Sequence, residues 1–222
     1  MTDSLFHRSD TLILFDSSEV DAYLRSEVGL GVEVLLEALQ RGGSEAAMAT
    51  PHNAAAAAGF RFWDGAVASL RDQLVPRGWF GDRPGGLEVV RRRDNRLQIT
   101  ASLGDEAVGG LGTNPSCRHE KGQSTDAAMQ CNQLTLAGYG SDDPGWEPML
   151  TWWLLYKFTS PDARRIVPEL SLPRVGVGGR VTDWAVRLLL PTINFGDRGP
   201  IRLSDLPNPA ATIEVPVRRA VA

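Results

Sequence analysis

Five residues that are able to hold an anion lie close together in the middle of the chain. Arg118 and Lys121 precede Gly122, Ser124 and Thr125, and the sequence then becomes helical in character, with Ser124 or Thr125 as the predicted N-cap. The first turn of a helix offers backbone N–H groups and the positive end of the helix dipole to phosphate or carboxylate groups. We therefore predict an anion-binding helix N-terminus here. The alternative is an ordinary helix cap beside solvated cations.

Three carboxylates support a second hypothesis, a metal-dependent phosphodiesterase or other hydrolase. Asp105 and Glu106 follow a predicted strand, and Glu169 interrupts an otherwise apolar one. Converging carboxylates hold a divalent cation that activates water, and Lys121 would then stabilise developing charge. Neighbouring side chains on a strand point to opposite faces, so at most one of the adjacent acids faces a shared site. The alternatives are solvated loop acids and, for Glu169, a cross-strand pair with Arg187.

Cys117, His119 and Cys131 supply three donors of the kind that zinc prefers, with His52 as the credible fourth. Their spacing matches no known zinc pattern, and a closed structural site takes four such ligands. We therefore assign no metal site and name no cofactor. Two cysteines in a chain of this length agree with reduced thiols.

Apolar spacing predicts which elements position these residues in the first half of the chain. It indicates a strand at 11–15, a helix capped by Ser17 or Ser18, a second helix that stops at Gly42 and Gly43, and a third from Phe60 that ends at Pro76. A turn-rich segment follows from Trp79 onward.

The second half of the chain is mostly strand-like. Segments 87–92 and 96–103 form a predicted hairpin whose tight turn contains Asp94 and Asn95, and segments 149–158 and 166–172 form another. A further strand is predicted at 180–190, where apolar and polar residues alternate.

Together these elements predict an α+β fold, with N-terminal helices packed on a mainly antiparallel sheet built from two hairpins plus a further strand. Residues 1–195 form one predicted domain, and residues 196–222 form a Pro-rich C-terminal arm or tail. The loop at 109–122 is longer than most connections in compact domains, which favours a functional role for it.

Composition narrows the class of protein. The chain has 222 residues, 42% of them hydrophobic and 23% charged, with a formal net charge of -4. These values are those of a globular domain, and the negative charge removes the simplest argument for nucleic-acid binding, although a local basic patch remains compatible with it. No stretch of 18 apolar residues and no signal sequence is present, so we expect a cytoplasmic protein without a membrane partner.

Several short segments resemble an uncharacterised family of bacterial cytoplasmic proteins. They are GDEAVG, KGQST, TWWLLYKF, PELSLP and RLLLPTI. The resemblance implies a bacterial, cytoplasmic origin and carries no established activity.

The leading hypothesis is a binding or accessory protein of a bacterial multicomponent system. The Gly104–Thr125 segment would contact an anionic, phosphate-bearing ligand or nucleic acid, and other protein subunits are possible partners. The alternatives are the hydrolase described above and a structural oligomerising subunit, which would expose an apolar surface on its terminal sheet.

Overall fold

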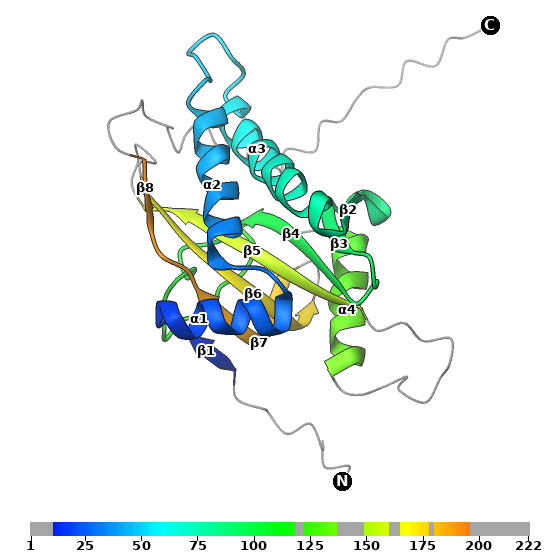
Figure 1. Ribbon diagram of the computed structural model, residues 1–222. Helices are drawn as coiled ribbons and strands as arrows, with labels where there is room; N and C mark the ends of the chain where they lie inside the picture. The colour runs from blue at the N-terminus through cyan, green and yellow to red at the C-terminus, as the bar shows by residue number, and fades with distance from the viewer. Residues whose placement is uncertain (1–10, 119–121, 137–148, 160–164, 178–179, 196–222) are drawn as a thin grey trace, which may run out of the picture.

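The computed structural model describes residues 11–118, 122–136, 149–159, 165–177 and 180–195. In this part of the chain one mixed sheet of eight strands has the order β1-β7-β6-β5-β4-β3-β2, and β8 pairs with β6 (Figure 1). The strands are β1 (Leu12–Leu14), β2 (Trp79–Asp82), β3 (Val89–Arg92), β4 (Leu97–Leu103), β5 (Leu150–Phe158), β6 (Arg165–Val177), β7 (Arg180–Leu189) and β8 (Ile193–Asn194). The helices are α1 (Ser17–Tyr23), which continues as the π-helical turn η1 (Leu24–Val28), then α2 (Val32–Ala46), α3 (Ala57–Leu74) and α4 (Gln123–Leu136), with the short 3-10 turns η2 (Val75–Arg77) and η3 (Pro84–Gly86).

The predicted α+β fold is confirmed. Both predicted hairpins are present, β3 with β4 and β5 with β6, and β7 continues the antiparallel sheet beyond β6. The β3–β4 turn places Asn95 at φ 57°, a left-handed conformation that Asn tolerates better than most residues. Two pairings are parallel, β1 with β7 and β4 with β5, so the sheet is mixed although mostly antiparallel.

The two faces of the sheet differ in chemistry. Helices α1 to α3 cover one face, where β5 contributes Trp152, Leu154 and Tyr156 to a large apolar core. The intervening residues Trp153 and Leu155 face the other side and belong to a small cluster with Met129 of α4. Strand alternation therefore sends the two adjacent indoles to opposite faces, and both are buried, so neither is exposed as a stacking platform.

The strand β7 departs from simple alternation. The β6–β7 register shifts between Leu172 and Pro173, at the place where Pro173 pairs with Trp184. Trp184 therefore joins the small cluster on the α4 side, whereas Val186 and Leu188 join the large core. Arg187, predicted as a polar residue of a half-buried strand, is only 1% exposed because the loop after β4 covers it.

Three predicted local features are wrong in detail. Helix α1 is capped by Asp16 and not by Ser17 or Ser18. The Ser18 hydroxyl and the backbone N–H groups of Glu19 and Ser18 donate to the Asp16 carboxylate, and these bonds hold the pKa of Asp16 below the ordinary value. The segment after Gly78 includes a strand, β2, because Trp79 pairs with Arg92. Helix α2 also does not stop at its glycine pair and runs on to Ala46.

The glycine pair in α2 has a packing role instead. A Cβ added at Gly42 would lie 2.6 Å from the carbonyl oxygen of Phe62 in α3, closer than real Cβ contacts. The absence of a side chain therefore allows the two helices to approach each other closely. Glycine has a low helix propensity, which predicts a helix end at Gly42. The contact with α3 outweighs this local preference, so the helix continues.

None of the described helices is both long and apolar enough to cross a membrane. The predicted C-terminal arm at 196–222 lies outside the described residues.

We expect replacement of Gly42 with Ala to destabilise the fold. Alanine is the better helix former by about 1 kcal/mol, so an isolated helix would gain stability from the change. Here the new Cβ must displace a backbone carbonyl, and overpacking of this kind costs about 1–3 kcal/mol. Chemical denaturation should therefore show a net loss for Gly42→Ala and almost no change for the exposed control Gln40→Ala. An increase in stability for Gly42→Ala would contradict the close contact of α2 and α3.

Candidate functional site

The loop that carries the predicted acids is a compact structure closed at its base. Gly104 forms a bridge with Cys117, the Asp105 N–H donates to Ser116 O, and the Arg118 N–H donates to Leu103 O. The ends of the loop therefore meet, as in other compact surface loops whose own groups hold them together. We call residues 104–118 the β4 loop.

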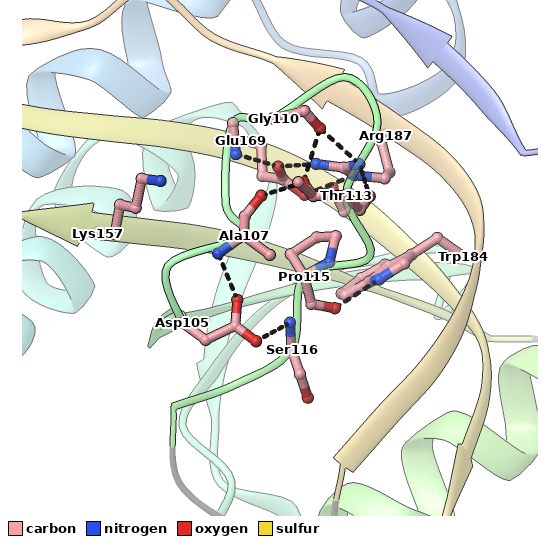
Figure 2. A network of polar contacts seen from close by, with 12 residues as sticks. Asp105, Ala107, Gly110, Thr113, Pro115, Ser116, Lys157, Glu169, Trp184 and Arg187 are labelled. Carbon is pink, nitrogen blue, oxygen red and sulfur yellow. Dashed lines mark hydrogen bonds and ion pairs between the residues drawn. The ribbon is translucent and has the colours of Figure 1, made fainter. Parts of the chain in front are cut away.

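Asp105 holds this loop from inside. Its Oδ1 accepts from the Ala107 N–H at 3.0 Å, and its Oδ2 accepts from the Ser116 N–H at 3.0 Å (Figure 2). The side chain is half-buried, whereas that of Glu106 is exposed and only the Glu106 carbonyl accepts from Lys157 Nζ. The two adjacent acids thus occupy different environments, although both lie in the loop beyond the end of β4.

Glu169 is fully buried and pairs with Arg187, the cross-strand partner that the sequence suggested. Arg187 Nη2 lies 2.6 Å from Glu169 Oε2, and Arg187 Nε donates to Oε1 at 3.1 Å. The Ser171 hydroxyl donates to Oε1, and the Gly109 N–H donates to Oε2. Every carboxylate oxygen therefore has two donors, which is what a buried charge requires.

The second half of the guanidinium reaches the β4 loop. Arg187 Nη1 donates to the carbonyls of Gly110 at 3.1 Å and Thr113 at 2.7 Å (Figure 2). Beside it, the Trp184 indole donates to Pro115 O at 2.8 Å. The ion pair and the indole thus fasten the loop to the sheet.

Asp105 and Glu169 therefore anchor the β4 loop. The carboxylate oxygens of both residues accept hydrogen bonds from protein donors. In the part of the chain that the structure describes, no three His, Cys, Asp or Glu residues gather in a way that could hold a metal ion. Cys117 is buried, and Cys131 is half-buried with its thiol donating to Met149 O; His119 lies outside the described residues. The hydrolase hypothesis stays a prediction without a geometric argument in its favour.

The predicted helix N-terminus lies beside a cavity. Its volume is about 240 Å³. It lies where β4 continues past its pairing with β3, between the turn η3 and the first turn of α4. We call it the α4 cavity; the lining residues are Trp63, Gly85, Gly86, Leu87, Glu88, Thr100, Ala101, Ser102, Gly122, Ser124, Thr125 and Trp153.

Three of the five predicted anion-binding residues line this cavity. Gly122, Ser124 and Thr125 contribute to its wall. Arg118 is exposed and is not part of the lining, and Lys121 lies outside the described residues. The structure therefore brings together the backbone part of the predicted site and separates Arg118 from it.

The first turn of α4 differs from the predicted cap. The helix begins at Gln123, and the Gly122 carbonyl accepts from the N–H groups of Thr125 and Asp126, so neither Ser124 nor Thr125 is the N-cap. Ser124 instead donates its hydroxyl to Gly85 O at 2.5 Å, which joins α4 to η3. Gly85 has φ 54°, and a Cβ there would collide with Ser124 Oγ, so the contact requires glycine.

Sequence reasoning missed two groups in the cavity. Trp153 is 1% exposed and its Nε1 has no hydrogen-bond partner among the described residues, although it lines an open space. Glu88 is ion-paired with Arg71, whose Nη2 lies 2.7 Å from Oε2, and with Arg83. The apolar pattern of β5 predicts that the Trp153 ring is buried. It does not indicate whether the indole N–H finds an acceptor there.

A buried donor without a partner is unusual, since folding removes it from water and returns no hydrogen bond. The Trp63 indole shows the ordinary outcome in the same cavity, because its Nε1 donates to Ala101 O at 3.2 Å. Among the described residues that line the cavity, Trp153 is therefore the one with a buried donor that lacks a protein acceptor.

We expect Arg187→Met to destabilise the protein by about 3 kcal/mol or more, since it leaves the Glu169 carboxylate buried without its counter-ion. The joint change Glu169→Leu with Arg187→Met should recover part of this loss, because no unpaired charge remains. Denaturant unfolding measures both, and hydrogen exchange should show faster opening at 104–118.

The pair Arg41–Asp72 is the matched control, since its N–O distance is also 2.6 Å but its side chains are 46% and 66% exposed. Asp72→Asn should change stability little, because water already solvates both charges. Equal losses at the two pairs would show that burial does not govern the Glu169–Arg187 pair.

Comparison of the chain with protein-family models, with curated proteins and with solved structures found no match. The resemblance to a bacterial family therefore stays a prediction.

Proposed function

We propose that this protein is a binding protein for a small anionic molecule, with the α4 cavity as its binding site. The observation that carries the proposal is Trp153, a residue that lines the cavity and whose buried indole N–H has no partner among the described residues. An indole N–H is a donor only, so its natural partner is an acceptor oxygen such as that of a phosphate or carboxylate.

The electrostatics of the cavity support an anion. At the start of α4 the backbone N–H groups of Thr125 and Asp126 already donate to the Gly122 carbonyl, and the helix dipole places partial positive charge at the same end. Glu88, the one carboxylate among the described lining residues, is ion-paired with the guanidinium groups of Arg71 and Arg83, which are not themselves among those lining residues. This pairing offsets the negative charge that Glu88 brings to the wall.

The hydroxyl groups in the lining support a polar ligand. Thr100, Ser102 and Thr125 are each at most 4% exposed and surround the cavity from β4 and α4. Such groups fix the orientation of a ligand in a cavity whose other walls are aromatic and aliphatic. A volume of about 240 Å³ suits a small molecule better than a nucleic-acid strand. Binding of a nucleic acid is therefore one of the outcomes that the titration below distinguishes.

The role of an accessory protein in a bacterial multicomponent system agrees with a binding site that lacks a catalytic set. A small-molecule sensor or carrier subunit needs recognition and no chemistry. This part of the proposal rests on the motif resemblance and the site together.

We expect inorganic phosphate to bind and to shift a single indole N–H resonance in ¹⁵N-edited NMR spectra. Trp153→Phe identifies that resonance, removes the donor and keeps most of the ring, so it should weaken phosphate binding by about tenfold, the effect of one hydrogen bond to a charged group. Titration calorimetry gives the affinities.

Trp152→Phe is the matched control, because Trp152 is the neighbouring buried indole and faces the apolar core instead of the cavity. Its Nε1 also has no partner within the part of the chain that the structure describes. It should leave phosphate affinity unchanged. A short oligonucleotide and acetate form the other arms of the titration. Absence of binding by phosphate and acetate, or equal effects of the two Trp variants, would overturn the proposal; tight oligonucleotide binding alone would assign the site to nucleic acid.

A further inference from the structure

A second cavity lies against the first, on the other side of the contact between Ser124 and Gly85. Its volume is about 300 Å³, and it shares Gly85, Leu87 and Ser124 with the lining of the α4 cavity. The residues that belong to it alone are Pro84, Arg91, Gln98, Ala127 and Ala128. We call it the Arg91 cavity.

A fixed guanidinium lines this cavity. The Gln98 Oε1 accepts from Arg91 Nε at 3.2 Å and from Nη2 at 3.0 Å, while Gln98 itself is 4% exposed and donates to Thr151 Oγ1 at 2.9 Å. Arg91 also stands over the Phe80 ring, 5.9 Å from its centroid. The orientation of the guanidinium is therefore set by a buried amide and an aromatic ring.

Part of the Arg91 guanidinium remains available to bind a ligand. Asp82 Oδ2 lies 3.1 Å from Arg91 Nη2, but the Asp82 side chain is 37% exposed and the Arg91 side chain is 17% exposed. Nη1 has no partner among the described residues. Gln98 and Asp82 occupy Nε and Nη2, so Nη1 is the nitrogen left to donate to an oxyanion in this partly buried setting.

The wall opposite Arg91 is made of small residues. Ala127 and Ala128 of α4 and Gly85 of η3 leave space beside the guanidinium. The Ser124–Gly85 hydrogen bond at 2.5 Å forms the boundary between the two cavities, so a molecule that lies across this bridge reaches both.

We propose that the two cavities are subsites of one elongated site for a ligand with two separated anionic groups. One group lies in the α4 cavity at the Trp153 N–H, and the other lies at Arg91. This inference rests on the proposed function and adds the class of ligand, a polyphosphate or a dicarboxylate. The shared chemistry is a pair of oxyanions joined by a short linker.

The test compares probes with one and two anionic groups by titration calorimetry on the whole chain. Inorganic phosphate and acetate carry one group; pyrophosphate, tripolyphosphate, succinate and adipate carry two or more. We expect at least one of the longer probes to bind about tenfold or more tightly than its one-group counterpart, the effect of one added charged hydrogen bond. The phosphate and carboxylate arms then distinguish the two sources of the oxyanions.

Two variants of the same ion pair separate ligand binding from a structural role. Arg91→Gln removes the guanidinium and should abolish the advantage of the longer probe over its one-group counterpart. Asp82→Asn removes the competing carboxylate, so it should preserve or increase that advantage. Parallel losses in both variants would mean that the Arg91–Asp82 pair is structural and would overturn the inference.

The remaining outcomes separate this inference from the proposed function. Phosphate binding that depends on Trp153, with no gain for any longer probe, overturns the second subsite and leaves the first. A longer probe whose binding depends on Arg91 but not on Trp153 supports the Arg91 subsite and overturns the α4 cavity. Failure of every probe to bind overturns both.

Discussion

The buried ion pair between Glu169 and Arg187 is the interaction on which the architecture of the α4 side depends. A carboxylate with no exposure and a guanidinium side chain at 2% cannot leave any polar atom unbonded without a large loss of stability. The pair satisfies only part of its own hydrogen-bonding capacity. Ser171 and the β4 loop supply the rest, since the Ser171 hydroxyl and the Gly109 N–H donate to the carboxylate and two loop carbonyls accept from the guanidinium. The loop therefore protects the pair from water, and the pair fixes the loop.

This arrangement divides the sheet into two chemically different layers. The face under α1 to α3 is apolar and can be assembled by burial of surface alone. The opposite face contains buried polar residues, and α4 is joined to it by directed bonds, as when the Asn132 amide donates to Thr151 O and its oxygen accepts from the Thr151 N–H. Hydrogen bonds restrict geometry more than apolar contact does. The polar face is therefore where cavities with defined donors can persist, and both cavities lie beside α4.

The sequence predicted the fold well where local signals agree with the tertiary structure. Asn95 in the β3–β4 turn and the alternating residues of β5 have the same role in isolation as in the folded chain. Prediction was wrong where packing overrules a local preference. Gly42 is a helix stop by propensity, yet in α2 it is the point at which α3 approaches. Three of the predicted residues, Gly122, Ser124 and Thr125, line the α4 cavity. The predicted role of Ser124 was wrong, because its hydroxyl donates to Gly85 O and does not cap its own helix.

The sequence by itself determined the fold class and the two hairpins, because these depend on periodicity and turn chemistry within short segments. It also named Arg187 as a partner for Glu169, since cross-strand neighbours follow from strand order. Only the tertiary structure decided which face each strand residue occupies after the register shift in β6 and β7, and which polar atoms lack a partner. Trp153 and Arg91 are candidate binding residues because each lines a cavity. The cavities are lined by residues from α3, β3, β4, β5, η3 and α4 at once, so no local pattern in the chain encodes them.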